Sequence, residues 1–267
     1  MSVVRTLHRL RSQMEHSERF RALRRELGMH VSDAYAVLAY SWRTTRDTHV
    51  DRELYRPLFQ PWLSEQWSTK LKTADPASCV SPDRKYVLYQ LLEQSACTLA
   101  GDLAECGVYQ GGTAKIFAER LRDLGSTKRL SLFDTFEGMP ETDPRYDLIQ
   151  RGDFSNTSLD GVRSYVGSFE NVEYFPGLVP ATLEAVRDRR FCFVHIDLDI
   201  YHPIAAATEF FYPRLTTGGI MIYDDYAFPS CPGARKAVDE FFADKRERPV
   251  VLGTGQCLVI KAPSEAG

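Results

Sequence analysis

Apolar residues follow two spacings along most of the chain, and the change between them separates strands from helices. From about residue 82 onward, short apolar runs alternate with longer stretches in which apolar residues recur at helical spacing. Short runs of this kind are typical of buried strands, and the longer stretches are typical of amphipathic helices. The predicted strands are Asp102–Val108, Leu130–Phe133, Val172–Phe175, Phe191–Ile196 and Gly219–Tyr223.

The predicted helices lie before, between and after these strands. They run from Asp83 toward Leu99 and over Thr113–Leu124, Ser158–Tyr165, Ala181–Asp188, Ile204–Leu215 and Gly233–Asp244. Alternation of this kind builds parallel β-α-β units. Val250–Leu252 and Cys257–Lys261 come last, and the glycines between them predict a hairpin. The expected fold is α/β: a doubly wound, mostly parallel seven-stranded sheet, closed at one edge by an antiparallel pair.

The first part of the chain lacks this alternation. Residues 1–30 repeat apolar residues at helical spacing and mix arginine with glutamate, which favours one or two amphipathic helices over an acid-poor transit peptide. Residues 51–75 carry four large aromatic residues: Tyr55, Phe59, Trp62 and Trp67. Such a segment suits a lid, an oligomer contact or a helical layer of the core. We expect residues 1–80 to form a helical arm or lid, and the chain to form a homo-oligomer.

Composition excludes several classes of protein. Of the 267 residues, 43% are hydrophobic and 26% charged, which is ordinary for a soluble globular chain and unlike collagen or a disordered segment. The net charge of −3 indicates neither a nucleic-acid nor a membrane partner, and no apolar run has the length of a membrane span. The six cysteines form no C-x-x-C pair and no zinc spacing with histidine. We expect reduced thiols in a cytoplasmic protein without a secretory signal.

A glycine-rich turn follows the first predicted strand, in the stretch ECGVYQGGT that begins at Glu105. Its spacing, E-x-G-x-x-x-G-G, is not the dinucleotide fingerprint G-x-G-x-x-G. Glycines let the backbone approach a ligand, and the next helix offers free N–H groups, although such a turn can equally be a packing feature. A glutamate here suits a ligand with a positive end. Asp134 closes the next strand, where an acid can accept hydrogen bonds from ribose hydroxyls or can form an Asx turn.

Two further predicted strands end in pairs of carboxylates. Asp197 and Asp199 belong to FVHIDLDIY, and Asp224 and Asp225 follow GGIMIY. On neighbouring strands these four acids would meet at one edge of the sheet, where unpaired negative charge is costly. No lysine or arginine stands beside either pair in the sequence. A divalent cation with oxygen ligands, Mg²⁺ or Ca²⁺ rather than zinc, would compensate the charge.

As a set, these motifs resemble those of class I S-adenosylmethionine-dependent methyltransferases and, more narrowly, of the macrocin O-methyltransferase family. The matching stretches are GDLAECGVYQGGTA, LFDTFEGMP, FVHIDLDIY, GGIMIYDDY, KAVDEFF and TGQCLVIK, spread over residues 101–261. Residues 1–75 carry little of the resemblance. It implies a Rossmann-like methyltransferase domain over residues 81–267 and Mg²⁺-dependent transfer of a methyl group from S-adenosylmethionine. The acceptor would be a small molecule, with a hydroxyl on a sugar or glycosylated natural product.

The resemblance also implies a role for individual residues. The cofactor contacts would be Glu105, Gly107, Tyr109, Gly111, Gly112, Thr113, Asp134 and Asp199. The metal ligands would be Asp197, Asp224 and Asp225. Asp197 is also the candidate general base for the acceptor hydroxyl, ahead of His195 and His202. The His202-Pro203 pair departs from what sugar-modifying members lead us to expect, which leaves the acceptor open.

Three alternatives remain at this point. A sugar-nucleotide glycosyltransferase would also use a D-x-D motif and a second acidic pair to hold a metal and a diphosphate, but Glu105 opposes a phosphate. A catechol or phenol O-methyltransferase would follow the same metal logic. A non-catalytic scaffold of methyltransferase ancestry is opposed by the complete set of acids at the strand ends.

Overall fold

The structure is a computed structural model that describes residues 61–64, 67, 71 and 77–263. The predicted helices within residues 1–30, the aromatic residues Tyr55 and Phe59, and most of the predicted arm lie outside the described residues. Within the described part, no helix combines the length and apolar composition needed to cross a membrane. All six cysteines are free thiols, of which Cys79 and Cys97 are exposed.

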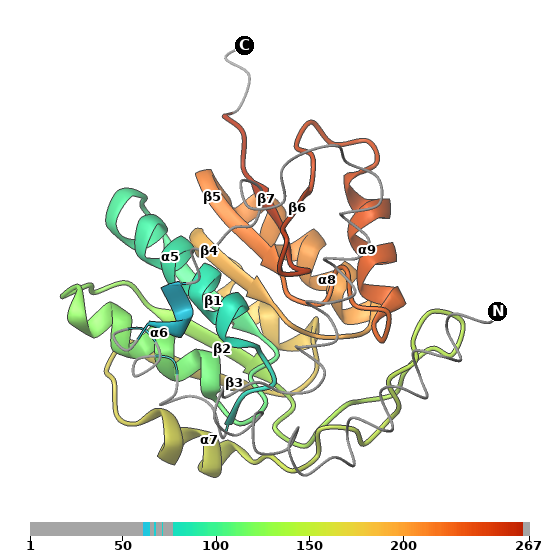
Figure 1. Cartoon of the computed structure of the whole chain (residues 1–267), viewed down its shortest axis with the longest axis horizontal. Helices are drawn as coiled ribbons and strands as arrows, with labels where there is room; N and C mark the ends of the chain where they lie inside the picture. The colour runs from blue at the N-terminus through green and yellow to red at the C-terminus, as the bar shows by residue number, and fades with distance from the viewer. Residues whose placement is uncertain (1–60, 65–66, 68–70, 72–76, 264–267) are drawn as a thin grey trace, which may run out of the picture. The chain divides into compact units, whose positions relative to one another are not determined.

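In the described part of the chain, a seven-stranded sheet has the order β3-β2-β1-β4-β5-β7-β6 (Figure 1). Strands β1 to β5 pair in parallel, and β7 is antiparallel to both β5 and β6. The sequence-based prediction of a mostly parallel α/β sheet closed by an antiparallel pair is confirmed. The strands are β1 (Asp102–Cys106), β2 (Leu130–Asp134), β3 (Val172–Pro176), β4 (Phe191–Ile196), β5 (Leu215–Tyr223), β6 (Val250–Val251) and β7 (Cys257–Ile260).

Helices cover both faces of this sheet, because successive strand residues point to opposite sides. On β4, Phe193 packs with α5, α6 and α7, whereas its neighbour Val194 packs with α8, α9 and the 3₁₀ helix η3. Figure 1 shows α5 and α6 on one side of the sheet and α8 and α9 on the other. The helices are η1 (Pro61–Leu63), α5 (Pro82–Thr98), α6 (Gly112–Asp123), α7 (Leu159–Val166), η3 (Ala181–Val186), α8 (Tyr201–Phe211), η4 (Tyr212–Arg214) and α9 (Pro232–Phe242).

Two predicted helices differ from the structure. Ala181–Asp188 is the short 3₁₀ helix η3 rather than an α-helix. The predicted helix Ile204–Leu215 begins earlier, at Tyr201, and its α-helical part ends at Phe211. Pro213 has no N–H group to continue the α-helical hydrogen bonds, so the chain tightens into η4 before Leu215 opens β5.

The two described tryptophans of segment 51–75 pack on α5. The ring centroid of Trp67 lies 4.8 Å from those of Tyr86 and Tyr89, edge to face in both cases, and Trp62 lies 6.0 Å from Tyr86. Neither tryptophan lines the cavity described below. The packing of these two side chains on α5 favours the helical layer over the lid among the alternatives raised for this segment.

The strand order places the ligand-binding edge. The chain continues from β1 to β2 and β3 on one side, and then returns to add β4 and β5 on the other side of β1. In open parallel sheets, ligands bind at the carboxyl ends of the strands, where the order reverses in this way. A cavity of about 480 Å³ lies there, lined by residues that follow β1, β2, β4 and β5.

Candidate active site

The glycine turn after β1 crosses directly over the end of β4. Gly107 has φ 87°, and a Cβ atom at this position would lie 1.7 Å from the carbonyl oxygen of Asp197. Only glycine combines this left-handed backbone with so close an approach. Tyr109 and Gly111 also have positive φ, and α6 begins immediately afterwards. The turn therefore brings backbone N–H groups and the start of a helix to the edge of the acid-bearing strand.

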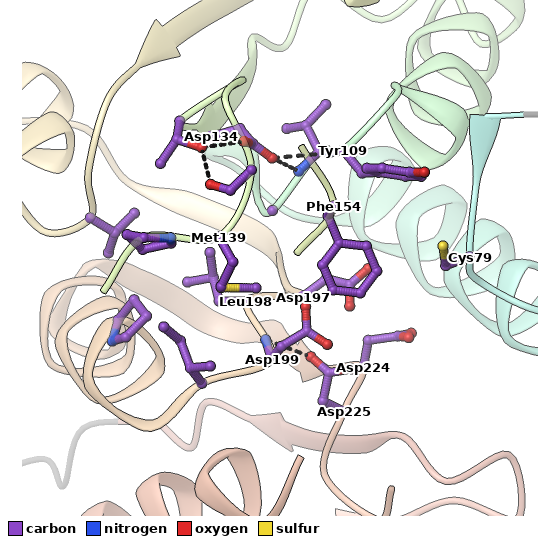
Figure 2. Close-up of a pocket in the computed structure, with 18 of the residues that line it drawn as sticks. Cys79, Tyr109, Asp134, Met139, Phe154, Asp197, Leu198, Asp199, Asp224 and Asp225 are labelled. Carbon is purple, nitrogen blue, oxygen red and sulfur yellow. Dashed lines mark hydrogen bonds between the residues drawn. The ribbon is translucent and has the colours of Figure 1, made fainter. Parts of the chain in front are cut away.

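Asp134, the last residue of β2, braces this turn. Its Oδ2 accepts hydrogen bonds from the N–H groups of Val108 (2.6 Å) and Tyr109 (2.9 Å). Its Oδ1 accepts one from the N–H of Phe136 (2.7 Å), which is the Asx turn considered from the sequence. The Thr135 hydroxyl lies 2.7 Å from the Gly138 carbonyl oxygen and 3.3 Å from Oδ1. Because its single proton is best donated to the nearer oxygen, Oδ1 keeps a lone pair for a further donor. Figure 2 shows Asp134 at the cavity wall.

Glu105 lies behind the turn instead of facing the cavity. Its side chain is fully buried, and its Oε1 accepts a hydrogen bond from the Thr113 hydroxyl and lies 3.0 Å from Nδ1 of His195. The structure does not bring this carboxylate to the cavity with Asp134, so it acts on the turn through Thr113. Of the predicted site residues, those that line the cavity are Gly107, Tyr109, Thr113, Asp134, Asp197, Asp199, Asp224 and Asp225. Those that do not are Glu105, Gly111 and Gly112.

The four acids at the ends of β4 and β5 (Asp197, Asp199, Asp224 and Asp225) meet in one acid cluster. Backbone hydrogen bonds continue past the strand ends, from Asp197 N–H to the Cys106 carbonyl (2.8 Å) and from Asp224 N–H to the Ile196 carbonyl (2.9 Å). These bonds set the first acids of the two pairs side by side. Oxygens of Asp197, Asp224 and Asp225 lie within 4.8 Å of one another. The predicted gathering of the strand-end acids is therefore present (Figure 2).

Asp199 reaches the cluster by a route that strand alternation does not predict. The strand ends at Ile196, and Asp199 adopts a left-handed backbone with φ 60°. Its N–H donates to Oδ2 of Asp225 (2.9 Å), and its Oδ1 accepts from the Cys231 thiol at 3.4 Å. A turn, rather than a continued extended strand, thus brings the second acid of the D-x-D motif to the cavity.

Burial and mutual repulsion shape the titration of the cluster. Burial, followed by the charges of the neighbouring acids, raises the pKa of Asp197 and Asp225 well above the usual range. Burial raises the pKa of Asp199 to about 6. Burial also acts to raise the pKa of Asp224, but His195, Arg84 and Gln256 outweigh it and lower that pKa. Three of the four carboxyls are thus short of compensating positive charge.

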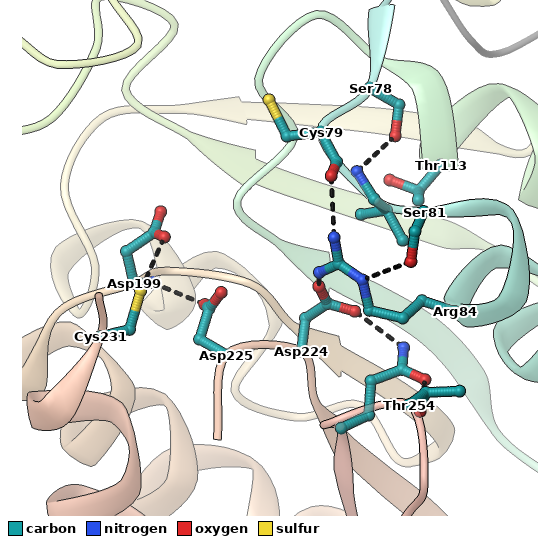
Figure 3. Close-up of polar contacts among 12 residues, drawn as sticks. Ser78, Cys79, Ser81, Arg84, Thr113, Asp199, Asp224, Asp225, Cys231 and Thr254 are labelled. Carbon is teal, nitrogen blue, oxygen red and sulfur yellow. Dashed lines mark hydrogen bonds and ion pairs between the residues drawn. The ribbon is translucent and has the colours of Figure 1, made fainter. Parts of the chain in front are cut away.

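Asp224 is held by residues that sequence reasoning missed. Arg84, in the first turn of α5, makes an ion pair with Asp224 Oδ2 although the two lie 140 positions apart (Figure 3). Gln256 donates to Asp224 Oδ1 at 2.7 Å, and Nε2 of His195 lies 3.7 Å from the same oxygen. Burial alone would lower the pKa of His195, but Asp224 and Glu105 raise it to about 9. The sequence analysis considered His195 only as a candidate base, and no local signal points to Arg84 or Gln256, because both come from distant elements.

The donor set fits a hard divalent cation. Asp197, Asp224 and Asp225 offer the carboxylate oxygens that Mg²⁺ and Ca²⁺ prefer, and the raised pKa values mark a place where added positive charge is favourable. The thiol of Cys231 could join Asp199 and Asp225, but burial raises its pKa far above neutrality and keeps it protonated, which disfavours a soft metal. A cation bound here would share Asp224 with Arg84.

Apolar side chains line the cavity beside the acids, among them Met139, Phe154 and Leu198 (Figure 2). Leu178 also lines it. The imidazole of His202 also lines the cavity, although it is 63% exposed, and its Nε2 lies 3.3 Å from Oδ2 of Asp143. His202 thus stands at the solvent side with its own partner, whereas Asp197 belongs to the acid cluster itself.

Comparisons with known proteins agree with this geometry. The macrocin-O-methyltransferase (TylF) family matches residues 84–251. The 8-demethyl-8-(2,3-dimethoxy-alpha-L-rhamnosyl)-tetracenomycin-C 4'-O-methyltransferase of Streptomyces olivaceus is 33% identical over 153 residues, which cover 53% of this chain and 58% of that protein. The mycinamicin III 3''-O-methyltransferase of Micromonospora griseorubida is 30% identical over 156 residues, covering 53% and 60%.

Among solved structures, the O-methyltransferase NovP superposes with a TM-score of 0.61 at 24% identity, over 67% of this chain and 80% of that one. This likeness shows the fold. The two relatives above match over less than two thirds of their own length. The family match, over residues 84–251, contains Arg84 and the strands β1 to β5, whereas Ala77 to Val80, which also line the cavity, lie before it.

Proposed function

Because the chain belongs to the macrocin-O-methyltransferase family, we propose that it transfers a methyl group from S-adenosylmethionine to a hydroxyl of a sugar on a natural product. The observation that carries the proposal is the junction of the glycine turn with the acid cluster in one cavity. By their names, the two relatives are O-methyltransferases of a rhamnosyl tetracenomycin and of mycinamicin III. We extend that class of acceptor, a glycosylated small molecule, to this chain.

The cofactor would lie along the turn after β1. Free N–H groups at the start of α6 suit its carboxylate end. The remaining lone pair on Oδ1 of Asp134 suits a ribose hydroxyl. Glu105 would hold Thr113 in place from behind rather than touch the cofactor. The negative cluster beside the turn favours a sulfonium over a pyrophosphate, which supports a methyltransferase over a glycosyltransferase.

The acceptor would enter from the apolar side of the cavity toward the acid cluster. Asp197, Asp224 and Asp225 would hold Mg²⁺, which supplies Lewis-acid stabilisation of the developing alkoxide. Asp197 would take the hydroxyl proton, because it lies at the cavity beneath the glycine turn. Methyl transfer is an in-line displacement, so the main task of these residues is to aim the acceptor oxygen at the methyl carbon.

The test is an acceptor screen with the full chain. Glycosylated natural products, free sugars and catechols are each incubated with S-adenosylmethionine, with Mg²⁺ or with excess EDTA, and formation of S-adenosylhomocysteine is measured. We expect turnover with a glycosylated acceptor and loss of turnover in EDTA. Turnover with catechols alone would replace the acceptor class, and full turnover in EDTA would remove the metal from the proposal.

A further inference from the structure

Arg84 brings a positive charge into the acid cluster from a different layer of the fold. Its guanidinium pairs with Oδ2 of Asp224, and the pair is sequestered: the Arg84 side chain is 11% exposed and that of Asp224 is 0% exposed. Arg84 also lines the cavity. A pair so removed from solvent is screened little by salt, unlike an ion pair on the surface.

Three further contacts fix the guanidinium in place. Its Nε donates to the Ser81 hydroxyl at 3.0 Å, and its Nη2 donates to the Cys79 carbonyl at 2.8 Å. The Phe228 ring lies 4.8 Å from Cζ. Figure 3 shows Cys79, from the segment before α5, and Ser81, the N-cap of α5, beside Arg84. Phe228 comes from the loop after β5. The planar guanidinium is therefore aimed at Asp224 in advance and needs no rearrangement to pair with it.

The charge of Arg84 acts on the whole cluster. It pairs with Asp224, whose ligand oxygen lies within 4.8 Å of oxygens of Asp197 and Asp225, so the positive charge also attracts these neighbouring carboxylates. In this respect the guanidinium does for the cluster what a bound cation would do. It also occupies an oxygen of Asp224 that a divalent cation would use.

We propose that Arg84 is a built-in counter-ion, which neutralises the acid cluster in the metal-free protein and competes with a divalent cation for Asp224. The inference rests on the metal site of the proposed function. Two cations that share one carboxylate repel each other, so metal binding must weaken the contact between Arg84 and Asp224. Cys79 lies just before α5 and Ser81 is its N-cap, and both hold Arg84. Metal binding would therefore also change the contacts of Arg84 with this side of the cavity.

The experiment compares the wild type with Arg84→Gln, Arg84→Lys and a control variant, Arg120→Gln. Arg120 lies on α6 and pairs with Glu93 of α5, so the control removes an ion pair of α5 outside the acid cluster. Melting temperatures are measured in EDTA and in Mg²⁺, and the Mg²⁺ dissociation constant is measured by calorimetry. Arg84→Gln should melt lower in EDTA, gain more from Mg²⁺ than the wild type does, and bind Mg²⁺ at least about tenfold more tightly. Arg84→Lys, which keeps the charge, should respond to Mg²⁺ as the wild type does. Arg120→Gln should lose stability without a changed Mg²⁺ response.

Equal Mg²⁺ shifts in Arg84→Gln and the wild type would overturn the inference, because Arg84 would then only pack. Weaker Mg²⁺ binding by Arg84→Gln would overturn it as well. If Mg²⁺ binds both proteins equally, the metal site of the proposed function survives; if it binds neither, that site falls too. Folding of Arg84→Gln only in Mg²⁺ would support the inference. Should this variant fold in neither buffer, an altered Mg²⁺ shift in Arg84→Lys would contradict the inference and an unchanged one would support it.

Discussion

Oε1 of Glu105 lies 3.0 Å from Nδ1 of His195, in a fully buried contact between the paired strands β1 and β4. The other nitrogen of the imidazole faces Asp224, at 3.7 Å. His195 thus stands between the residue that supports the cofactor turn through Thr113 and the best-held member of the acid cluster. A cationic imidazole between two carboxylates is stabilised by both of them, which explains its raised pKa.

This arrangement predicts a pH dependence of stability in the metal-free protein. Because the pKa of His195 is raised to about 9, the folded protein keeps a proton that the unfolded chain releases above about pH 6.5. The contribution is complete below pH 6.5 or so and is lost as the pH rises through about 9. The free energy of unfolding, measured by urea titration in EDTA, should therefore fall over this interval, and fall less in His195→Gln. Parallel pH profiles for the two proteins would contradict the prediction.

Asp225→Asn should abolish methyl transfer while cofactor binding persists. Asp225 offers an oxygen to the cluster and makes no contact with Arg84, so the variant removes one metal ligand and keeps the shape of the side chain. The loss in kcat should exceed the 10- to 100-fold range typical of groups that act from behind the ligands. S-adenosylhomocysteine affinity, measured by calorimetry, should stay within about twofold. Asp188→Asn, at an exposed site, is the control, and retained turnover in Asp225→Asn would argue against the site.

Asp134→Asn should weaken binding of both S-adenosylmethionine and S-adenosylhomocysteine. The carboxylate accepts N–H groups on both oxygens, and an amide would set its own donors against them. The expected loss is about 1.5–3 kcal/mol, the range for hydrogen bonds to a charged group. Calorimetry with both ligands measures it, with the exposed Asp160→Asn as the matched control. Unchanged affinity would move the nucleoside contact away from Asp134.

Gly107→Ala should destabilise the fold and displace Asp197. The added Cβ would meet the Asp197 carbonyl oxygen at 1.7 Å, and the positive φ adds strain. We expect a loss of more than about 3 kcal/mol in the free energy of unfolding, or no folded protein. Gly253→Ala provides the comparison, because its Cβ would meet nothing within 4 Å and its φ is not positive; its effect should stay within about 0.5 kcal/mol. A loss below about 1 kcal/mol in Gly107→Ala would show that the turn can move away.

The sheet could be predicted because its signals are local. Strand β4 was bounded correctly, since Phe191 to Ile196 are buried on both faces and apolar except for His195, and polar residues flank them. Asp134 and the strand-end acids were found for the same reason, because a carboxylate that ends an apolar run needs only its neighbours to be recognised. The ends of the helix around Pro213 were missed because a helical period says little about where the hydrogen bonds change type.

Two partners of Asp224 could not be predicted, because the residues around each of them in the sequence do not indicate that it contacts Asp224. Arg84 stands in an ordinary first turn of a helix, and Gln256 stands in a hairpin. The sequence argument for a metal assumed that no cation lies near the acids, whereas the fold supplies one from 140 positions away. The partners of Glu105, Thr113 and His195, were not predicted either. A strand residue points to one of two faces, and the pattern ECG does not tell which face meets the ligand.

Trp67→Ala should reduce stability without changing catalysis. The Trp67 ring meets Tyr86 and Tyr89 edge to face on α5 and does not line the cavity, so its loss removes packing from the helical layer. The side chain is partly buried, and we expect a loss of about 2–3 kcal/mol, below the range for a fully buried tryptophan. Urea titration gives the loss, and kcat and KM for the acceptor are compared per folded molecule. A raised acceptor KM at normal stability would instead make Trp67 part of a lid. Trp62, whose ring also packs against Tyr86 of α5, should then show the same change in the variant Trp62→Ala.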